Sequence, residues 1–225
     1  MKRIRYLLVL LAVSFGGSCV ESTLEMEQED ETFCDSRSGN SSLDATLAYL
    51  KTTRLGGSLW DTATSRLLNN MEINFVYSPS IHRRSMKYIG EGRIVYNADG
   101  MSENGFLQLA FHELFHVLQT GVNYKQSLND EIEAYLAQYI FLVSLGHGAK
   151  FDADDLTQII KDLAKNIDMN TGEILHPKRF RADYEIALGV IKTMELYKNK
   201  EDEEPWIEEP HKDVPCLTSF LKNVN

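Results

Sequence analysis

Positive charge is scarce in this 225-residue chain, and the shortage excludes a large class of partners. Lys and Arg number 23 against 33 Asp and Glu, which gives a formal net charge of −10 at pH 7. A protein that binds nucleic acid needs clustered basic side chains to neutralise the phosphates. We therefore expect no nucleic-acid partner.

Long apolar runs are also lacking after the N-terminus. A membrane-spanning helix needs about 20 mostly apolar residues, and no such run follows residue 18. Hydrophobic residues still make up 43% of the chain, enough to bury a sizeable core, and the length permits one domain or two small ones. We predict one folded domain over residues 43–225, preceded by segments of another kind.

Cysteine occurs only three times, and the first, Cys19, follows a segment of signal-peptide type. Residues 2–5 include three basic side chains, residues 6–15 form an apolar stretch too short to span a bilayer, and small residues occupy 16–18. We predict that residues 1–18 are a signal peptide and that the mature protein is exported. Small residues before a Cys resemble a bacterial lipobox, which implies cleavage before Cys19 and lipidation of that residue. An ordinary signal peptide cut nearby is the alternative.

Residues 19–42 form the next segment, and acidic side chains dominate its first half. Six of them lie between residues 21 and 31, with almost nothing that could build a core. We predict a disordered acidic tether. An acidic stretch after a lipidated Cys also resembles the surface-export signals of Bacteroidetes lipoproteins. That resemblance implies a lipid anchor in the bacterial outer membrane, on its periplasmic or cell-surface side, although a solvated linker explains the same composition.

Cys34 and Cys216 are the other two thiols. In an exported protein they could form one disulfide that ties the tether to the C-terminal tail. The sequence gives no measure of the distance between them, so a disulfide and two free thiols both stay open.

The spacing of apolar residues predicts an α+β fold that is rich in helix. A period of 3.6 indicates helices, and alternation indicates strands. We expect Gly56 and Gly57 to end the first helix, and residues 168–173 to form a turn rather than a calcium loop. The expected helices cover residues 43–55, 59–70, 107–119, 127–145, 152–167 and 181–197, and the expected strands cover residues 72–77, 86–89 and 93–97, the last two as a hairpin.

The functional prediction is built around His-Glu-Leu-Phe-His, residues 112–116. Residues 107–119 carry an apolar stripe of helical period, and residues four apart share one face of a helix. His112 and His116 lie roughly opposite that stripe, so they can present two imidazole nitrogens to one metal ion. Glu113 projects to the side, where it can reach a metal-bound water. Two histidines hydrogen-bonded in the core are the alternative, but these would lie among the leucines.

A catalytic zinc site needs a third protein ligand and one open position. Glu131 and Glu133 lie near the start of the next expected helix, which Ser127 opens with a capping-box pattern. Both flank the apolar stripe of that helix at similar angles, so their spacing does not choose between them. Either could instead simply favour the positive end of the helix dipole.

HELFH followed by Glu-Ile-Glu-Ala on a second helix resembles the gluzincin branch of the zincin metallopeptidases. In gluzincins the third zinc ligand is a Glu of the following helix, commonly in an E-x-x-A setting, which favours Glu131 and leaves Glu133 in reserve. The resemblance implies Zn²⁺ as the cofactor, His112, His116 and Glu131 as its ligands, and Glu113 as the general base. It also implies a zincin-like domain, in which a small antiparallel-containing sheet packs on the HExxH helix and further helices follow.

Two further expectations come from the same resemblance. The last strand of a zincin sheet runs along the cleft and pairs with the substrate, which would assign that role to residues 93–97. Several gluzincins carry an Asp where this chain has Tyr135. The usual hydrogen-bond partner of a zinc histidine is therefore not identified in this sequence.

The function implied is hydrolysis of peptide bonds in a peptide or protein substrate, through a metal-activated water with Glu113 as the base. The oxyanion would need a further donor. The sequence offers five donors without ranking them: Tyr124, Tyr135, His147, His176 and Tyr184. Two alternatives are a non-catalytic surface lipoprotein that uses a zincin-like fold for binding, and a zinc amidase that acts on cell-wall peptide.

Overall fold

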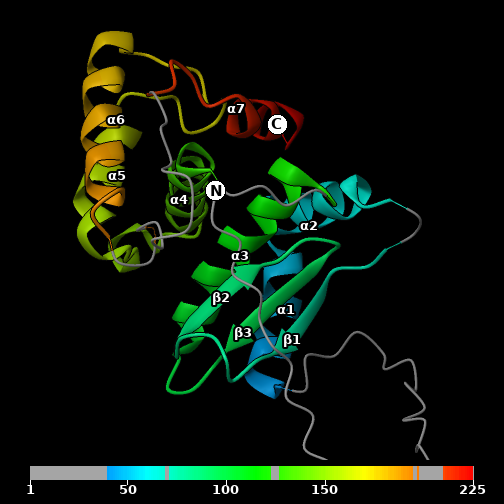
Figure 1. Cartoon of the computed structure of the whole chain (residues 1–225). Coiled ribbons are helices and arrows are strands. Elements are labelled where there is room, and N and C mark those ends of the chain that lie inside the picture. Colours follow the sequence, from blue (N-terminus) through cyan, green and yellow to red (C-terminus); the bar gives the residue numbers. More distant parts are fainter. Residues whose placement is uncertain (1–39, 69–70, 123–126, 195–196, 198–209, 225) are drawn as a thin grey trace, which may run out of the picture. The chain divides into compact units, whose positions relative to one another are not determined.

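The structure, a computed structural model, describes residues 40–68, 71–122, 127–194, 197 and 210–224. The predicted signal peptide, Cys19, Cys34 and the tether up to residue 39 lie outside these ranges. The described part is a helix-rich α+β fold with a small three-stranded mixed sheet (Figure 1), as predicted. None of its helices combines the length and the apolar character needed to cross a membrane.

The described chain begins with α1 (Ser41–Thr52) and α2 (Arg54–Arg66). Thr53 separates them: its backbone is extended, and its hydroxyl caps α2 by accepting the N–H of Gly56 at 3.1 Å. The prediction that Gly56 and Gly57 end the first helix is therefore wrong, and both glycines lie inside α2. Gly56 serves a close approach instead, because a Cβ there would lie 2.3 Å from the carbonyl oxygen of Leu50.

The sheet consists of β1 (Asn74–Tyr77), β2 (Ser85–Tyr88) and β3 (Arg93–Asn97), in the order β1-β3-β2. β3 pairs parallel with β1 and antiparallel with β2, so the predicted hairpin is confirmed. It turns through Gly90 and Gly92, both at positive φ. The expectation that residues 93–97 bind substrate is wrong, because β3 is hydrogen-bonded on both sides and has no edge to offer. β2 is an edge strand.

The two helices that carry the predicted site residues are α3 (Glu103–Thr120) and α4 (Leu128–Ser144). α3 contacts α1, α2, α4 and β2, so it lies at the centre of the core, and its predicted apolar stripe is buried. Gly121 ends α3 with φ 57° and an N–H that reaches the carbonyl of Val117. Ser127 caps α4 by accepting the N–H of Asp130 at 3.2 Å. Both helix boundaries agree with the sequence pattern.

The remaining described elements are η1 (Gly148–Lys150), η2 (Asp154–Leu156), α5 (Thr157–Ala164), α6 (Pro177–Ile191) and α7 (Pro215–Val224). α6 begins four residues earlier than predicted, with Pro177 in its first turn, where a missing N–H costs nothing. α7 was not predicted. Residues 168–173 form the expected turn, in which the Asp168 carboxylate accepts the N–H of Asn170 at 2.7 Å.

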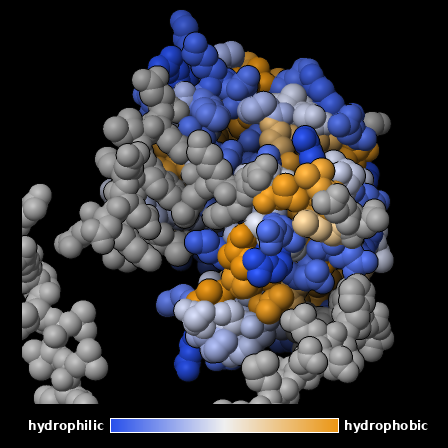
Figure 2. Space-filling model, turned by 45° about the vertical axis from the view of Figure 1, so that its right-hand side comes forward, coloured by the Kyte–Doolittle hydropathy of each residue, from blue (hydrophilic) through white to orange (hydrophobic). Residues whose placement is uncertain are grey.

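The surface gives little indication of function. The face drawn in Figure 2 is mostly hydrophilic, and its apolar side chains are exposed in small groups between polar ones. Scattered exposure of this kind is ordinary for a folded protein. Buried polar residues are more informative, and the buried histidines and carboxylic acids of the described residues are His112, Glu113, His116, Glu131 and Glu133.

Candidate metal centre

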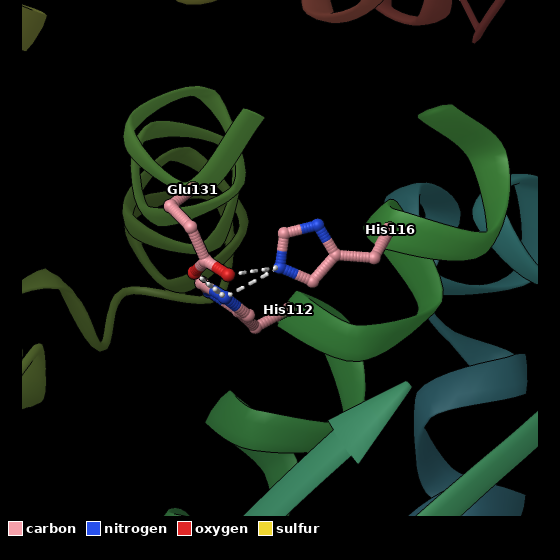
Figure 3. A group of neighbouring side chains, drawn as sticks. All are labelled: His112, His116 and Glu131. Carbon is pink, nitrogen blue, oxygen red and sulfur yellow. Dashed lines mark hydrogen bonds and ion pairs between the residues drawn. The ribbon is translucent and has the colours of Figure 1, made fainter. Parts of the chain in front are cut away.

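Three side chains from two helices converge at the contact between α3 and α4 (Figure 3). The two Nε2 atoms of His112 and His116 are 3.0 Å apart. His112 Nε2 lies 3.3 Å from Glu131 Oε2, and His116 Nε2 lies 3.5 Å from Glu131 Oε1. All three residues are buried, with 4 to 8% of their surface exposed. This buried His-His-Glu group could hold a metal ion.

Local structure explains why these atoms meet. His112 and His116 are four residues apart on α3 and therefore lie on one face. The Ser127 cap sets the start of α4, which places Glu131 in the first turns of that helix. Because α3 and α4 pack against each other, the carboxylate reaches across to both imidazoles. The two histidines thus point away from the apolar stripe of α3, as expected, but they face α4 and not solvent.

A hydrogen bond at Nδ1 of His116 orients its imidazole ring. Its Nδ1 lies 2.8 Å from Gln119 Oε1, and the amide nitrogen of Gln119 donates to the carbonyl oxygen of Asp130 at 3.0 Å. A carbonyl oxygen only accepts, so the amide must face Asp130 with its nitrogen and His116 with its oxygen. His116 therefore carries its donated proton on Nδ1, and the lone pair of the neutral ring is on Nε2, facing Glu131.

A longer chain of hydrogen bonds orients His112 in the same way. Its Nδ1 lies 3.1 Å from Gln138 Oε1, and Gln138 donates its amide to Gln108 Oε1 at 3.2 Å. The orientation of Gln108 is set by backbone groups, because it accepts the N–H of Asp152 and donates to the carbonyl of Lys150. Both histidines thus present an Nε2 lone pair to the same point, as a shared cation requires.

Sequence reasoning missed both glutamines. The resemblance left the hydrogen-bond partner of a zinc histidine unidentified, because Tyr135 stands where several gluzincins carry an Asp. Gln119 could have been found, since it lies three residues after His116 on the same helix and hence on the same side. Gln138 carries no such signal, because its contact with His112 depends on how two helices pack.

The charges within the group are strongly coupled. Burial by itself would raise the pKa of Glu131, but His116 and His112 outweigh that effect and hold the pKa well below the ordinary 4.5. Burial by itself would lower the pKa of His116, but Glu131 outweighs it and raises that pKa from 6.5 to about 9. Without a bound cation, His116 therefore keeps its extra proton next to the Glu131 carboxylate. A divalent cation would replace that proton, as metal ions do at sites of this composition.

Glu113 lies between α3 and the edge strand. Its Oε2 accepts the backbone N–H of Tyr88 in β2 at 2.7 Å. Tyr88 also fastens β2 to the end of α3, because its hydroxyl donates to the carbonyl of Gly121. Burial raises the pKa of the Glu113 carboxyl, while His112 and His116 act in the opposite direction. A buried carboxyl of raised pKa can both accept and return a proton.

Glu133 points away from the histidines. Its Oε1 accepts the backbone N–H of Leu217 in α7 at 2.8 Å, and its Oε2 accepts the amide of Gln119 at 3.3 Å. Burial is the main cause that raises its pKa from 4.5 to about 7. The structure thus places Glu131 in the His-His-Glu group and Glu133 in the contact with α7.

Among the four predicted oxyanion donors that the structure describes, only Tyr135 contacts the group. Its ring centroid lies 4.5 Å from that of His112. Tyr184 donates to Asn129 Oδ1 at 2.9 Å instead. His147 and His176 precede η1 and α6 and are not part of the group, and Tyr124 lies outside the described residues.

One further tyrosine contacts the group and was not predicted. The hydroxyl of Tyr197 donates to Glu131 Oε2 at 2.9 Å, and the hydroxyl of Tyr135 lies 3.1 Å from that of Tyr197. No sequence signal could have found this contact, because 66 positions separate Tyr197 from Glu131.

Two surface hollows lie apart from the group. One, of about 660 Å³, is lined by residues 82–84, 99 and 100, and the other, of about 310 Å³, is lined by parts of α1, α3 and the segment 147–150. Neither lining includes His112, His116 or Glu131. The centre is therefore identified by its chemistry and not by the size of a cavity.

Comparisons with protein-family models, with curated proteins and with solved structures found no match for this chain. The fold and the site together define a helix-rich α+β protein with a buried His-His-Glu group that could hold a metal ion. Assigning the protein to a narrower functional class depends on residues 112–138 and their geometry.

Proposed function

We propose that this protein is a zinc-dependent metallopeptidase of gluzincin type on a zincin-like domain. His112, His116 and Glu131 would be the ligands, and Glu113 the general base. The observation that carries the proposal is the convergence of two imidazole Nε2 atoms and one carboxylate in a buried group, in which a glutamine oxygen lies within hydrogen-bond distance of the Nδ1 of each histidine. Two histidines and a Glu are a known donor set of catalytic zinc.

The donor set favours zinc over the hard cations. Mg²⁺ and Ca²⁺ prefer all-oxygen coordination, whereas two imidazoles suit zinc and other transition metals. A zinc ion held there would polarise a peptide carbonyl and lower the pKa of a coordinated water. The chain itself then has to supply a base, a place for the substrate backbone and a closed environment.

Glu113 meets the first of these needs. The N–H of Tyr88 holds its Oε2, and its raised pKa allows it to take a proton from the attacking water and return it to the leaving nitrogen.

β2 meets the second need. It is an edge strand, and the outward N–H of Tyr88 shows which of its sides faces Glu113. Backbone groups alternate along a strand, so the polar groups of Met86 face the same way as those of Tyr88. An extended peptide could add to this edge and bring one carbonyl to the centre. This role replaces the one expected for residues 93–97.

The proposed location is supported by the N-terminal sequence alone. A basic start, a short apolar stretch and small residues before Cys19 favour an exported lipoprotein anchored in the bacterial outer membrane. The acidic residues that follow would keep the folded domain away from the membrane surface.

Glu113→Gln provides the test. The wild type and the variant should both bind one zinc per chain, and the variant should lose cleavage of a mixed peptide library. Glu103→Gln is the matched control, since Glu103 is exposed on the same helix and should leave both properties unchanged. Cleavage by Glu113→Gln at the wild-type rate would remove the proposed base. Digestion of cell-wall peptide but not of protein would assign the amidase reaction instead.

A further inference from the structure

We propose that Tyr197 is a positioning residue for the third metal ligand, and that its hydroxyl reserves one carboxylate oxygen of Glu131 for the metal. The inference rests on the metal centre of the proposed function. It does not depend on which bond the protein hydrolyses.

The direction of the hydrogen bonds follows from the chemistry of the partners. The hydroxyl of Tyr197 donates to Oε2 of Glu131 at 2.9 Å. A phenol has one proton to donate, so the bond between the two hydroxyls is donated by Tyr135. Tyr135 and Tyr197 thus form a relay of two donors that ends on Oε2 of Glu131.

This relay makes the two oxygens of Glu131 different. Oε2 accepts from Tyr197 at 2.9 Å and also lies 3.3 Å from His112 Nε2, whereas no hydroxyl or amide of the described residues donates to Oε1, which lies 3.5 Å from His116 Nε2. A carboxylate that is held by one oxygen binds a cation through the other. Glu131 would then occupy one coordination position instead of two and leave a position for water or substrate.

A purely structural role for Tyr197 is the competing explanation. Tyr197 is 6% exposed, and a buried hydroxyl needs a partner. On that view its removal would lower the stability of the fold and leave the coordination of the metal unchanged. The two explanations therefore differ in a property of the metal and not in a property of the fold.

Tyr197→Phe tests the proposal, because it removes the hydroxyl and keeps the ring. Tyr135→Phe is the matched control, since it removes the neighbouring hydroxyl of the same relay and leaves the bond to Glu131. The purified full chain is titrated with Co²⁺ and with Zn²⁺, and the coordination number is measured from the Co²⁺ absorption spectrum and from zinc X-ray absorption. Thermal unfolding in chelator reports the stability of each variant.

We expect Tyr197→Phe to bind metal roughly 10- to 100-fold more weakly, in the range found when the hydrogen-bond partner of a ligand is removed. Its Co²⁺ spectrum should show the weaker bands of higher coordination, as both oxygens of Glu131 bind. Tyr135→Phe should keep the wild-type spectrum.

Wild-type affinity and spectrum in a folded Tyr197→Phe would overturn the inference and leave the proposed function intact. Equal spectral changes in both variants would also overturn it, because they would not depend on the bond to Glu131. A wild type that binds metal but cleaves nothing would instead reject the peptidase, and one that binds no metal would reject both.

Discussion

Replacing Glu133 by Gln is expected to change how the stability of this protein depends on pH. Glu133 is 5% exposed, and burial is the main cause that raises its pKa from 4.5 to about 7. The pKa in the folded state thus lies above the unfolded value, so the protonated form stabilises the fold. This contribution is fully present below pH 4.5 and is lost as the pH rises through about 7.

The size of the effect follows from the same values. A pKa raised from 4.5 to about 7 corresponds to about 3.5 kcal/mol, at roughly 1.4 kcal/mol for each pKa unit. Gln cannot ionise, but it has one acceptor oxygen for the two donors from Leu217 and Gln119. The lost hydrogen bond costs about 1 kcal/mol. Glu133→Gln should therefore be about 1 kcal/mol less stable than the wild type at pH 4.5 and about 2.5 kcal/mol more stable at pH 8.

Urea unfolding of the two proteins in the presence of chelator, from pH 4.5 to 8, measures this difference. His116 and the other titrating groups are common to both proteins, so their contributions cancel in the comparison. Glu103→Gln should show no change with pH relative to the wild type, because that side chain is exposed. A stability difference between Glu133→Gln and the wild type that stays constant over this pH range would refute the reasoning.

Three other predictions concern the metal centre and the N-terminus. Gln119→Leu and Gln138→Leu should each weaken zinc binding roughly 10- to 100-fold, since each leaves a ligand histidine without the acceptor that orients it; wild-type affinity in a competition titration with a chelator would contradict this. Zinc affinity should rise about tenfold per pH unit up to about pH 9, because the metal displaces the proton of His116. Calorimetry in buffers of different ionisation enthalpy should detect that released proton. In a bacterial host, Cys19→Ser should abolish labelling of the protein by a fatty acid, and continued labelling would reject the predicted anchor.

The parts of the site that could be predicted are those that depend on short stretches of chain. His112 and His116 share a helix turn, and the Ser127 cap and Gly121 mark where α4 begins and α3 ends. Periodicity and capping act within a few residues, so one sequence is enough to read them. The choice between Glu131 and Glu133 lay beyond such rules, because both flank the same apolar stripe and differ only in what α3 and α7 place opposite them.

The features that sequence reasoning missed are long-range. Gln138 meets His112 across 26 positions and Tyr197 meets Glu131 across 66, and no local pattern reports such contacts. The misassigned substrate strand has the same origin. Residues 93–97 form a strand as predicted, but the order of strands in the sheet depends on where the chain returns after β1. Local propensity predicts which residues form strands, whereas the packing of the whole chain decides which strand lies at the edge of the sheet.

The contact between Glu133 and α7 has a consequence for when the protein can become active. Gln119 touches both Glu133 and His116, so the first turn of the last helix is linked to a metal ligand through two side chains. A nascent chain that has not yet placed Leu217 lacks the donor that Glu133 needs. We therefore expect the metal centre to form only after α7 has been synthesised and docked, which would keep the proposed hydrolase inactive during translation.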